Sequence, residues 1–162
     1  MNRRLSSYFA SVSLLLLSAC SSYAPPTPLV GLGRESIEAR MGSPSTVRQL
    51  ASGSVLEFPR GPYGHHTWFV YLDAGGRAVR AEQVLTQQSF LRIAPDMTQE
   101  EVRNLLGKPA ETYELGRARG VVWSYRYENN DCLWFQVEIT QEKTVRSAGL
   151  GPLPGCDPRR DD

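Results

Sequence analysis

A short motif occurs twice in this chain, first as Ile37-Glu38-Ala39-Arg40-Met41-Gly42-Ser43-Pro44 and again as Val102-Arg103-Asn104-Leu105-Leu106-Gly107-Lys108-Pro109. Both copies end in Gly-x-Pro, and apolar residues occupy the same two positions in each. A second match follows, because Trp68-Phe69 and Trp134-Phe135 are separated by nearly the same offset. Shared order and spacing, more than any single motif, indicate an internal duplication of units of about 65 residues.

We expect each unit to begin with a short helix. In the second copy, Thr98 can cap the helix and Glu101 can complete a capping box. The apolar residues between 102 and 106 fall on one helical face, and Gly107 is placed to end the helix in a left-handed turn. Residues 34–41 predict the equivalent helix in the first copy, with a less clear pattern.

Strands are expected to follow each helix. Residues 122–127 and 133–139 alternate between the two faces of a strand, which is the period of a half-buried sheet, and the polar segment 128–131 has the composition of a turn. The corresponding strands of the first unit are expected at 55–58, 67–72 and 77–85, with a turn at 74–76, and a further short helix is expected at 89–93.

The predicted fold class is therefore α+β, with two tandem repeats that each pack a short helical pair on a three- to four-stranded antiparallel sheet. A unit of this size buries little core by itself. We accordingly expect one compact body, in which helices are buried against sheets and a sheet extends across both units.

The beginning of the chain has the pattern of a bacterial lipoprotein signal. Arg3 and Arg4 precede an apolar run over residues 5–17, and small residues then lead to a cysteine. The run is shorter than the roughly 20 residues of a spanning helix, although an uncleaved anchor helix stays an alternative. We predict lipidation at Cys20 after cleavage at a lipobox formed by Leu17, Ser18 and Ala19.

The residue after the cysteine bears on location. Ser21 stands where an aspartate would signal retention in the inner membrane, so the sequence favours an outer-membrane anchor facing the periplasm. The expected organisation has five parts: a signal peptide at 1–19, a lipidated Pro-rich tether at 20–29, a first helix-plus-meander repeat at 30–86, a second at 87–148, and a disulfide-pinned C-terminal tail at 149–162.

Two further cysteines, Cys132 and Cys156, remain once Cys20 carries lipid. An even count in an exported protein favours a disulfide between them, and closing a loop of this length stabilises the fold by roughly 3 kcal/mol in the chain-entropy model. A reactive or metal-binding role is disfavoured because the pair lacks C-x-x-C spacing.

The ordered set of motifs resembles the SmpA/OmlA family of small outer-membrane lipoproteins, which includes the E component of the β-barrel assembly machinery. The resemblance is clearest from Ile93 to Val145, and the first unit carries a weaker version. It implies a helical pair on a three-stranded antiparallel sheet and a role in envelope integrity or β-barrel assembly. The motifs that carry it are Met97-Thr98, Val102, Leu106-Gly107-Lys108-Pro109, Trp123-Ser124-Tyr125 and Phe135.

This chain departs from that family by containing two units where typical members contain one. Tandem units of similar shape resemble the secreted β-lactamase inhibitory proteins, which bind a partner protein on the concave face of the sheet. The shared residues are core and turn positions, so they transfer fold better than function.

Sequence evidence for catalysis is weak. Nucleophile-elbow, phosphate-loop and metalloprotease motifs are absent, and the only histidines, His65 and His66, point to opposite faces if they lie on a strand. Removal of residues 1–19 leaves a net charge of about −1 without a basic cluster, which argues against nucleic acid. We expect no enzyme activity, cofactor or metal; an envelope hydrolase with an unrecognised site ranks last.

The aromatic residues offer a candidate partner face. Trp68 and Trp134 occupy equivalent positions, each on the strand face opposite the following phenylalanine. If the phenylalanines face the helices, both tryptophans face away from them, where they suit protein contact. Two alternatives stay open: the aromatics form sheet core, or the C-terminal tail covers Trp134. The expected partner is an envelope protein, for example the β-barrel assembly machinery, and the alternative role is binding or inhibiting another envelope protein.

Overall fold

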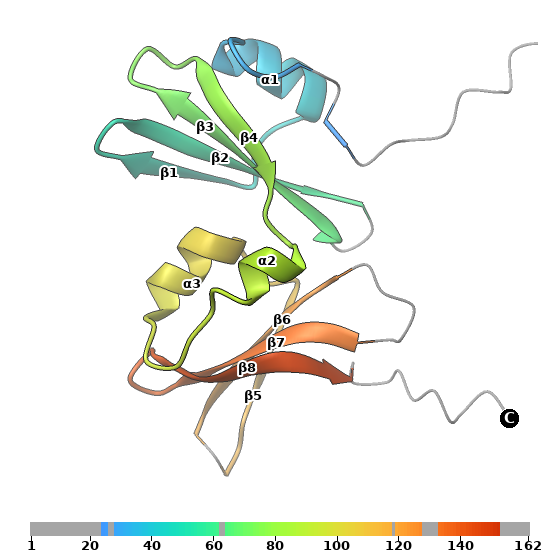
Figure 1. Cartoon of the computed structure of the whole chain (residues 1–162), viewed down its shortest axis with the longest axis vertical. Coiled ribbons are helices and arrows are strands. Elements are labelled where there is room, and N and C mark those ends of the chain that lie inside the picture. The colour runs from blue at the N-terminus through green and yellow to red at the C-terminus, as the bar shows by residue number, and fades with distance from the viewer. Residues whose placement is uncertain (1–23, 26–27, 62–63, 118, 128–132, 153–162) are drawn as a thin grey trace, which may run out of the picture.

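The computed structural model describes residues 24–25, 28–61, 64–117, 119–127 and 133–152. These residues form two separate four-stranded antiparallel sheets and three short helices (Figure 1). The elements stack in four layers, in the order α1, first sheet, α2 with α3, second sheet.

Each sheet is a simple meander in which neighbours in sequence are neighbours in space. The first unit consists of α1 (Arg34–Met41), β1 (Thr46–Leu50), β2 (Gly53–Arg60), β3 (His66–Asp73) and β4 (Ala78–Gln83). The second unit consists of α2 (Gln87–Phe90), α3 (Gln99–Leu106), β5 (Glu111–Glu114), β6 (Gly120–Tyr125), β7 (Leu133–Thr140) and β8 (Val145–Pro152).

The duplication is visible in backbone detail. Gly53 opens β2 and Gly120 opens β6, with φ angles of 147° and 154°. In each case a Cβ atom would collide with a carbonyl oxygen of the next strand, at 1.9 Å from Leu72 O and 2.4 Å from Ile139 O. Only glycine fits such a close approach of two backbones, so the two units share a local constraint that sequence comparison alone did not single out.

The helix that the sequence predicted most firmly, α3, begins at the expected cap. It ends at Gly107, whose φ of 79° is positive but whose ψ of −159° lies outside the left-handed turn that the sequence predicts. The Thr98 hydroxyl accepts a hydrogen bond from the Glu101 N–H at 3.2 Å, and the Glu101 carboxylate accepts one from the Thr98 N–H at 2.7 Å. By contrast, α1 begins after Gly33 without a side-chain cap, which agrees with its weaker sequence pattern.

The first sheet is covered on both faces. On one face, Ile37 and Met41 of α1 pack on a buried cluster of the first unit. On the other face, Val55 and Phe69 belong to the same core as α2, α3 and the second sheet. The two helices of the second unit therefore supply core to both sheets. That shared core consists of Val55, Phe69, Val84, Leu85, Phe90, Val102, Leu106, Trp123, Tyr125, Phe135, Val137, Ile139 and Val145.

The predicted α+β class with two tandem units is confirmed, and some details differ. The described strands form no sheet that extends across the units, because α2 and α3 lie between the two sheets. Within the described residues the first unit has one helix, while the second has the expected pair. The short helix expected at 89–93 begins at Gln87, where Thr86 caps it, and residues 149–152 continue β8 where an irregular tail was expected.

Candidate functional site

Two groups of predicted site residues lie outside the described residues. They are the lipidation site with its lipobox, Cys20, Leu17, Ser18 and Ala19, and the disulfide pair, Cys132 and Cys156. Lipidation and the disulfide therefore stay predictions. None of the helices in the described part of the chain combines the length and the hydrophobicity that crossing a membrane requires.

The two tryptophans lie on different layers of the molecule. Trp68 packs with the α1-side cluster of the first sheet, whereas Trp134 lies on the face of the second sheet turned away from α2 and α3. Phe69 and Phe135 both face α2 and α3. Trp68, on the other side of β3, faces α1, the helix of its own unit, so the expectation that both tryptophans face away from the helices is wrong for Trp68. Trp134 is only 7% exposed, and the guanidinium of Arg126 lies 4.2 Å from the centre of its ring. The pair therefore does not form one shared surface.

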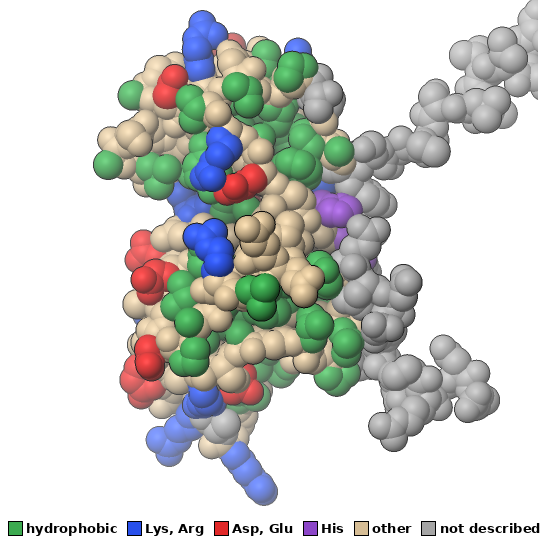
Figure 2. All heavy atoms as spheres, in the orientation of Figure 1, with side chains coloured by type: hydrophobic (Ala, Val, Ile, Leu, Met, Phe, Trp, Pro, Cys, Tyr) green, Lys and Arg blue, Asp and Glu red, His purple; other side chains and the backbone are tan. Residues whose placement is uncertain are grey.

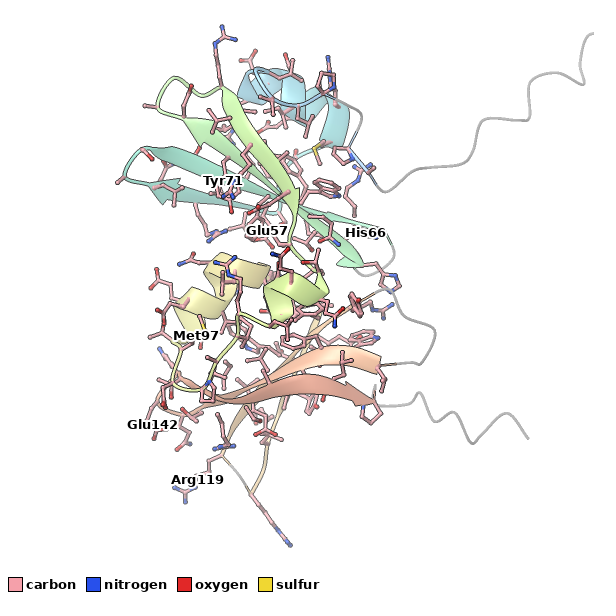
Figure 3. All side chains as sticks on the ribbon, in the orientation of Figure 1. Glu57, His66, Tyr71, Met97, Arg119 and Glu142 are labelled. Atoms are coloured by element: carbon pink, nitrogen blue, oxygen red, sulfur yellow. The ribbon has the colours of Figure 1, made fainter. Side chains whose placement is uncertain are left out.

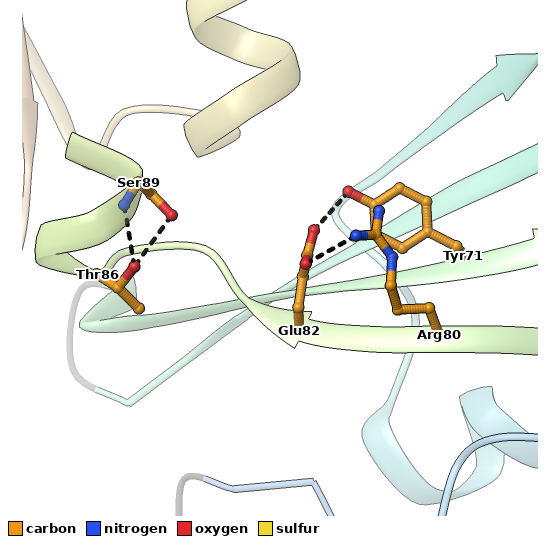
Figure 4. A network of polar contacts seen from close by, with 5 residues as sticks. All are labelled: Tyr71, Arg80, Glu82, Thr86 and Ser89. Atoms are coloured by element: carbon orange, nitrogen blue, oxygen red, sulfur yellow. Dashed lines mark hydrogen bonds and ion pairs between the residues drawn. The ribbon is translucent and has the colours of Figure 1, made fainter. Parts of the chain in front are cut away.

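A polar hollow of about 430 Å³ opens between β4 of the first unit and the helices of the second. In its wall the Tyr71 hydroxyl donates a hydrogen bond to Glu82 at 2.7 Å, and Arg80 donates to the same carboxylate at 3.1 Å (Figure 4). The Arg80 guanidinium also lies 3.8 Å from the centre of the Tyr71 ring. To the left of this network in Figure 4, at the start of α2, the Thr86 and Ser89 hydroxyls pair with each other at 3.0 Å.

The chemistry of the hollow does not favour proton abstraction. Burial and then the hydrogen bond to Glu82 raise the pKa of Tyr71 to about 12, so its hydroxyl stays protonated and acts as a donor at neutral pH. The Ser89 hydroxyl is paired with the Thr86 hydroxyl, which is not a base that could activate a serine as a nucleophile. Among the residues that the structure describes, no three His, Cys, Asp or Glu side chains gather into a metal site.

The two histidines lie where the chain enters β3. His66 is the first residue of β3, and both histidines line a shallow hollow of about 300 Å³ with Leu85 and Tyr127. The described residues that line this hollow include no carboxylate.

A buried carboxylate joins the two units, and sequence reasoning did not assign it this role. Glu57 is 1% exposed and faces the helix layer (Figure 3), where its Oε1 accepts the backbone N–H of Lys108 at 2.8 Å. The neighbouring Gly107 carbonyl accepts the Tyr125 hydroxyl at 3.2 Å. The Gly-x-Pro motif of the second unit therefore docks on a side chain of the first.

An apolar hollow of about 490 Å³ lies beside α2 and β8. Phe90 forms its base, stacked on Phe135 with ring centres 4.2 Å apart and meeting Tyr127 edge-on at 5.3 Å. Leu91 and Leu150 stand at its rim with exposed fractions of 80% and 56%. Figure 2 shows hydrophobic side chains gathered in this part of the molecule, near the end of β8. None of the described residues that line it is charged: Gln87, Phe90, Leu91, Tyr127, Phe135, Ala148, Gly149 and Leu150.

Comparison with known proteins gives no family. No family model matches the chain, and no curated protein matches it. The resemblance to the SmpA/OmlA family therefore stays an expectation from the motifs quoted above.

Solved structures include distant neighbours at low identity. One is a protein provisionally described as a β-lactamase inhibitor from Streptococcus mutans, at 11% identity, 76% of this chain, 85% of that chain and a TM-score of 0.32. A DUF4309 family protein from Bacillus subtilis matches at 10% identity, with 75% and 78% covered and a TM-score of 0.30.

A third neighbour is an extracellular protein containing an SCP domain from Bacillus anthracis. It matches at 13% identity over 81% of this chain and 46% of that chain, with a TM-score of 0.32. These TM-scores give no basis for transferring a role from any of the three proteins.

Proposed function

We propose that this chain is a lipid-anchored protein of the bacterial envelope that works by contact with another protein and performs no chemistry of its own. The observation that carries the contact role is the uncharged hollow beside α2 and β8, with Leu91 and Leu150 exposed at its rim. Large apolar side chains grouped around a hollow are typical of interaction surfaces. The lipobox at 17–20 supports the anchor.

The finer assignment comes from the sequence. Ser21 favours the outer membrane and the periplasmic face, and the motif resemblance favours a role in envelope integrity or in the assembly of β-barrel proteins. Binding or inhibition of a single envelope protein uses the same surface and is the second candidate, because the exposed hollow suits either partner.

The anchor is tested by metabolic labelling with an alkyne fatty acid. We expect the label on the wild-type chain, its loss in Cys20→Ser, and wild-type protein in the outer-membrane fraction. An unlabelled mature chain would contradict the anchored state.

The contact role is tested by a photo-crosslinking amino acid placed in cells at Leu91, with Val79 as the matched position. Val79 is 57% exposed but lies on β4, away from the hollow. Repeated capture of β-barrel assembly subunits from Leu91 alone supports the first role, and capture of one envelope enzyme supports the second. Equal capture from both positions would contradict a specific contact at the hollow.

A further inference from the structure

In the part of the chain that the structure describes, the outer edge of β8 is covered at its first residue, where Val145 accepts a hydrogen bond from the Asp96 N–H and donates one to the Met97 carbonyl, and it is open from Arg146 onward. β8 is the last strand in the order β5-β6-β7-β8, and no described strand pairs with its second side. It spans eight residues, more than the other edge strands β1, β4 and β5. An unpaired edge presents backbone N–H and C=O groups that can bind another extended chain.

The four edge strands differ in charge. Natural sheets discourage pairing at their edges with charged side chains. β1 carries Arg48, β4 carries Arg80 and Glu82, and β5 carries two glutamates within four residues. In β8, by contrast, residues 147–152 contain no charge after Arg146. Residues 147–152 of this edge therefore form a stretch without a charged side chain, and that stretch borders the apolar hollow.

The side chains of β8 define what a further strand would meet. Leu150 is paired with Phe135 and lies on the helix-facing side, at the rim of the hollow. The opposite side carries Ser147, Gly149 and Gly151, and a Cβ placed on Gly149 would meet no atom within 4 Å. Alternate side chains of an added strand would therefore enter the hollow, while the others would lie over small residues.

We propose that β8 binds an extended, uncharged segment of a partner polypeptide as a fifth strand of the second sheet, with apolar side chains at alternate positions seated in the hollow. This inference rests on the proposed contact function and states how the partner is bound. The open edge supplies main-chain hydrogen bonds and the hollow supplies side-chain selectivity, the two parts of recognition by strand addition. A charged side chain in the hollow would be buried without a partner, which is strongly unfavourable.

The test uses the full lipidated chain in nanodiscs of phosphatidylethanolamine and phosphatidylglycerol. The probe is a fluorescent ten-residue peptide with blocked ends in which valine and threonine alternate. The control peptide has the same side chains, but its amides are N-methylated along one edge, which removes strand hydrogen bonds. We expect saturable binding by fluorescence anisotropy and at least about tenfold weaker binding of the control. Equal binding of both peptides, or no binding, would overturn the proposal.

Two matched variants test whether the peptide binds at β8. Leu150→Lys and Val79→Lys each put a charge on an edge-strand position of nearly equal exposure, 56% and 57%. We expect Leu150→Lys to weaken binding at least about tenfold and Val79→Lys to leave it unchanged, with circular dichroism confirming that both variants fold. Equal effects would refute binding at β8. If the wild-type chain self-associates and Leu150→Lys dissociates it, the occupant of the β8 edge is a second copy of this chain. That outcome would overturn binding of a separate partner polypeptide.

The outcome separates this inference from the proposed function. If the peptide fails to bind while Leu91 still captures an envelope protein in cells, contact stands and strand addition is wrong. If the peptide binds with the expected selectivity while Cys20 carries no lipid, strand addition stands and the anchored state is wrong.

Discussion

Replacement of Gly107 by alanine tests the junction between the two units, and the duplication provides its control. Gly107 and Gly42 end α3 and α1 at equivalent positions, with φ and ψ of 79° and −159° against 82° and −176°. Both conformations are close to glycine-only, so either alanine costs about 1–3 kcal/mol in backbone strain. The two sites differ in their surroundings.

At Gly42 a Cβ atom would meet nothing within 4 Å. At Gly107 it would lie 2.8 Å from Oε1 of Glu57 and 3.2 Å from a ring carbon of Phe69. The carboxylate must then leave the Lys108 N–H, and a hydrogen bond to a charged group contributes about 1.5–3 kcal/mol. We expect Gly107→Ala to lower the free energy of unfolding by about 2 kcal/mol more than Gly42→Ala.

The measurement is urea unfolding of both variants in a lipid-free Cys20→Ser background. A double-mutant cycle sharpens it, because Glu57→Ala removes the side chain that the new methyl group displaces. Gly107→Ala should then cost only its backbone strain, which leaves a coupling energy of about 2 kcal/mol between the two sites. Equal losses at Gly107 and Gly42, or additive effects in the cycle, would refute the idea that Glu57 holds the units together.

Three further predictions concern single side chains. Hydrogen bonds from the Thr98 backbone N–H, and then from the Thr98 hydroxyl, lower the pKa of Glu101. Because Thr98→Ala removes the hydroxyl and keeps the N–H, it should raise the pKa of Glu101 part of the way to its ordinary value in an NMR titration. An unchanged pKa would contradict the capping box. The stabilising effect of ionised Glu101 is present above its unfolded pKa and is lost as pH falls through the lowered value. Glu82→Gln should lower the pKa of Tyr71 from about 12, measured by ultraviolet difference absorbance, yet leave it above the ordinary value because burial is the larger cause. Since the pKa of Tyr71 is raised on folding, its contribution to stability is complete below the unfolded value near 10 and disappears as pH rises through about 12. Phe90→Ala should cost about 3–5 kcal/mol in urea unfolding, because its ring stacks on Phe135 in the shared core; a loss below 1 kcal/mol would show that α2 is not fixed by this contact.

Local signals explain which elements the sequence predicted. The capping box and the Gly-x-Pro ending specify α3 within a few residues, and the alternation over 133–139 specifies most of β7. β1 and β5 were not identified, because Thr46–Leu50 and Glu111–Glu114 are short and largely polar. Their conformation depends on pairing with β2 and β6, which is a tertiary contact.

Glu57 shows where sequence reasoning about the site reached its limit. It stands between Leu56 and Phe58, and a polar residue between apolar neighbours indicates a solvent-facing position. The first sheet is covered on that face by the second unit, however, so the carboxylate is buried and accepts the Lys108 N–H. The duplication predicted two similar units, but not that the helices of one would lie between both sheets.

The hollow beside β8 was missed for a related reason. Residues 149–152 are rich in glycine and proline and have no alternating strand pattern, so the sequence predicts an irregular tail there. They form a strand because they pair with β7, where Leu150 lies opposite Phe135. The exposure of Leu91 and Leu150 around one hollow depends on how α2 lies beside β8, which is a tertiary arrangement and not a local property of either segment.

The position of α2 and α3 between the sheets has a consequence for folding during the proposed export. If the amino end crosses the membrane first, the first sheet can form before residues 87–106 have crossed, and Val55 and Phe69 then have no cover. Until those residues emerge, the same helices from a second molecule could cover the sheet and produce an intertwined dimer. Slow crossing of residues 83–106 should therefore favour exchanged pairs, with the short connection from β4 to α2 as the hinge of the exchange.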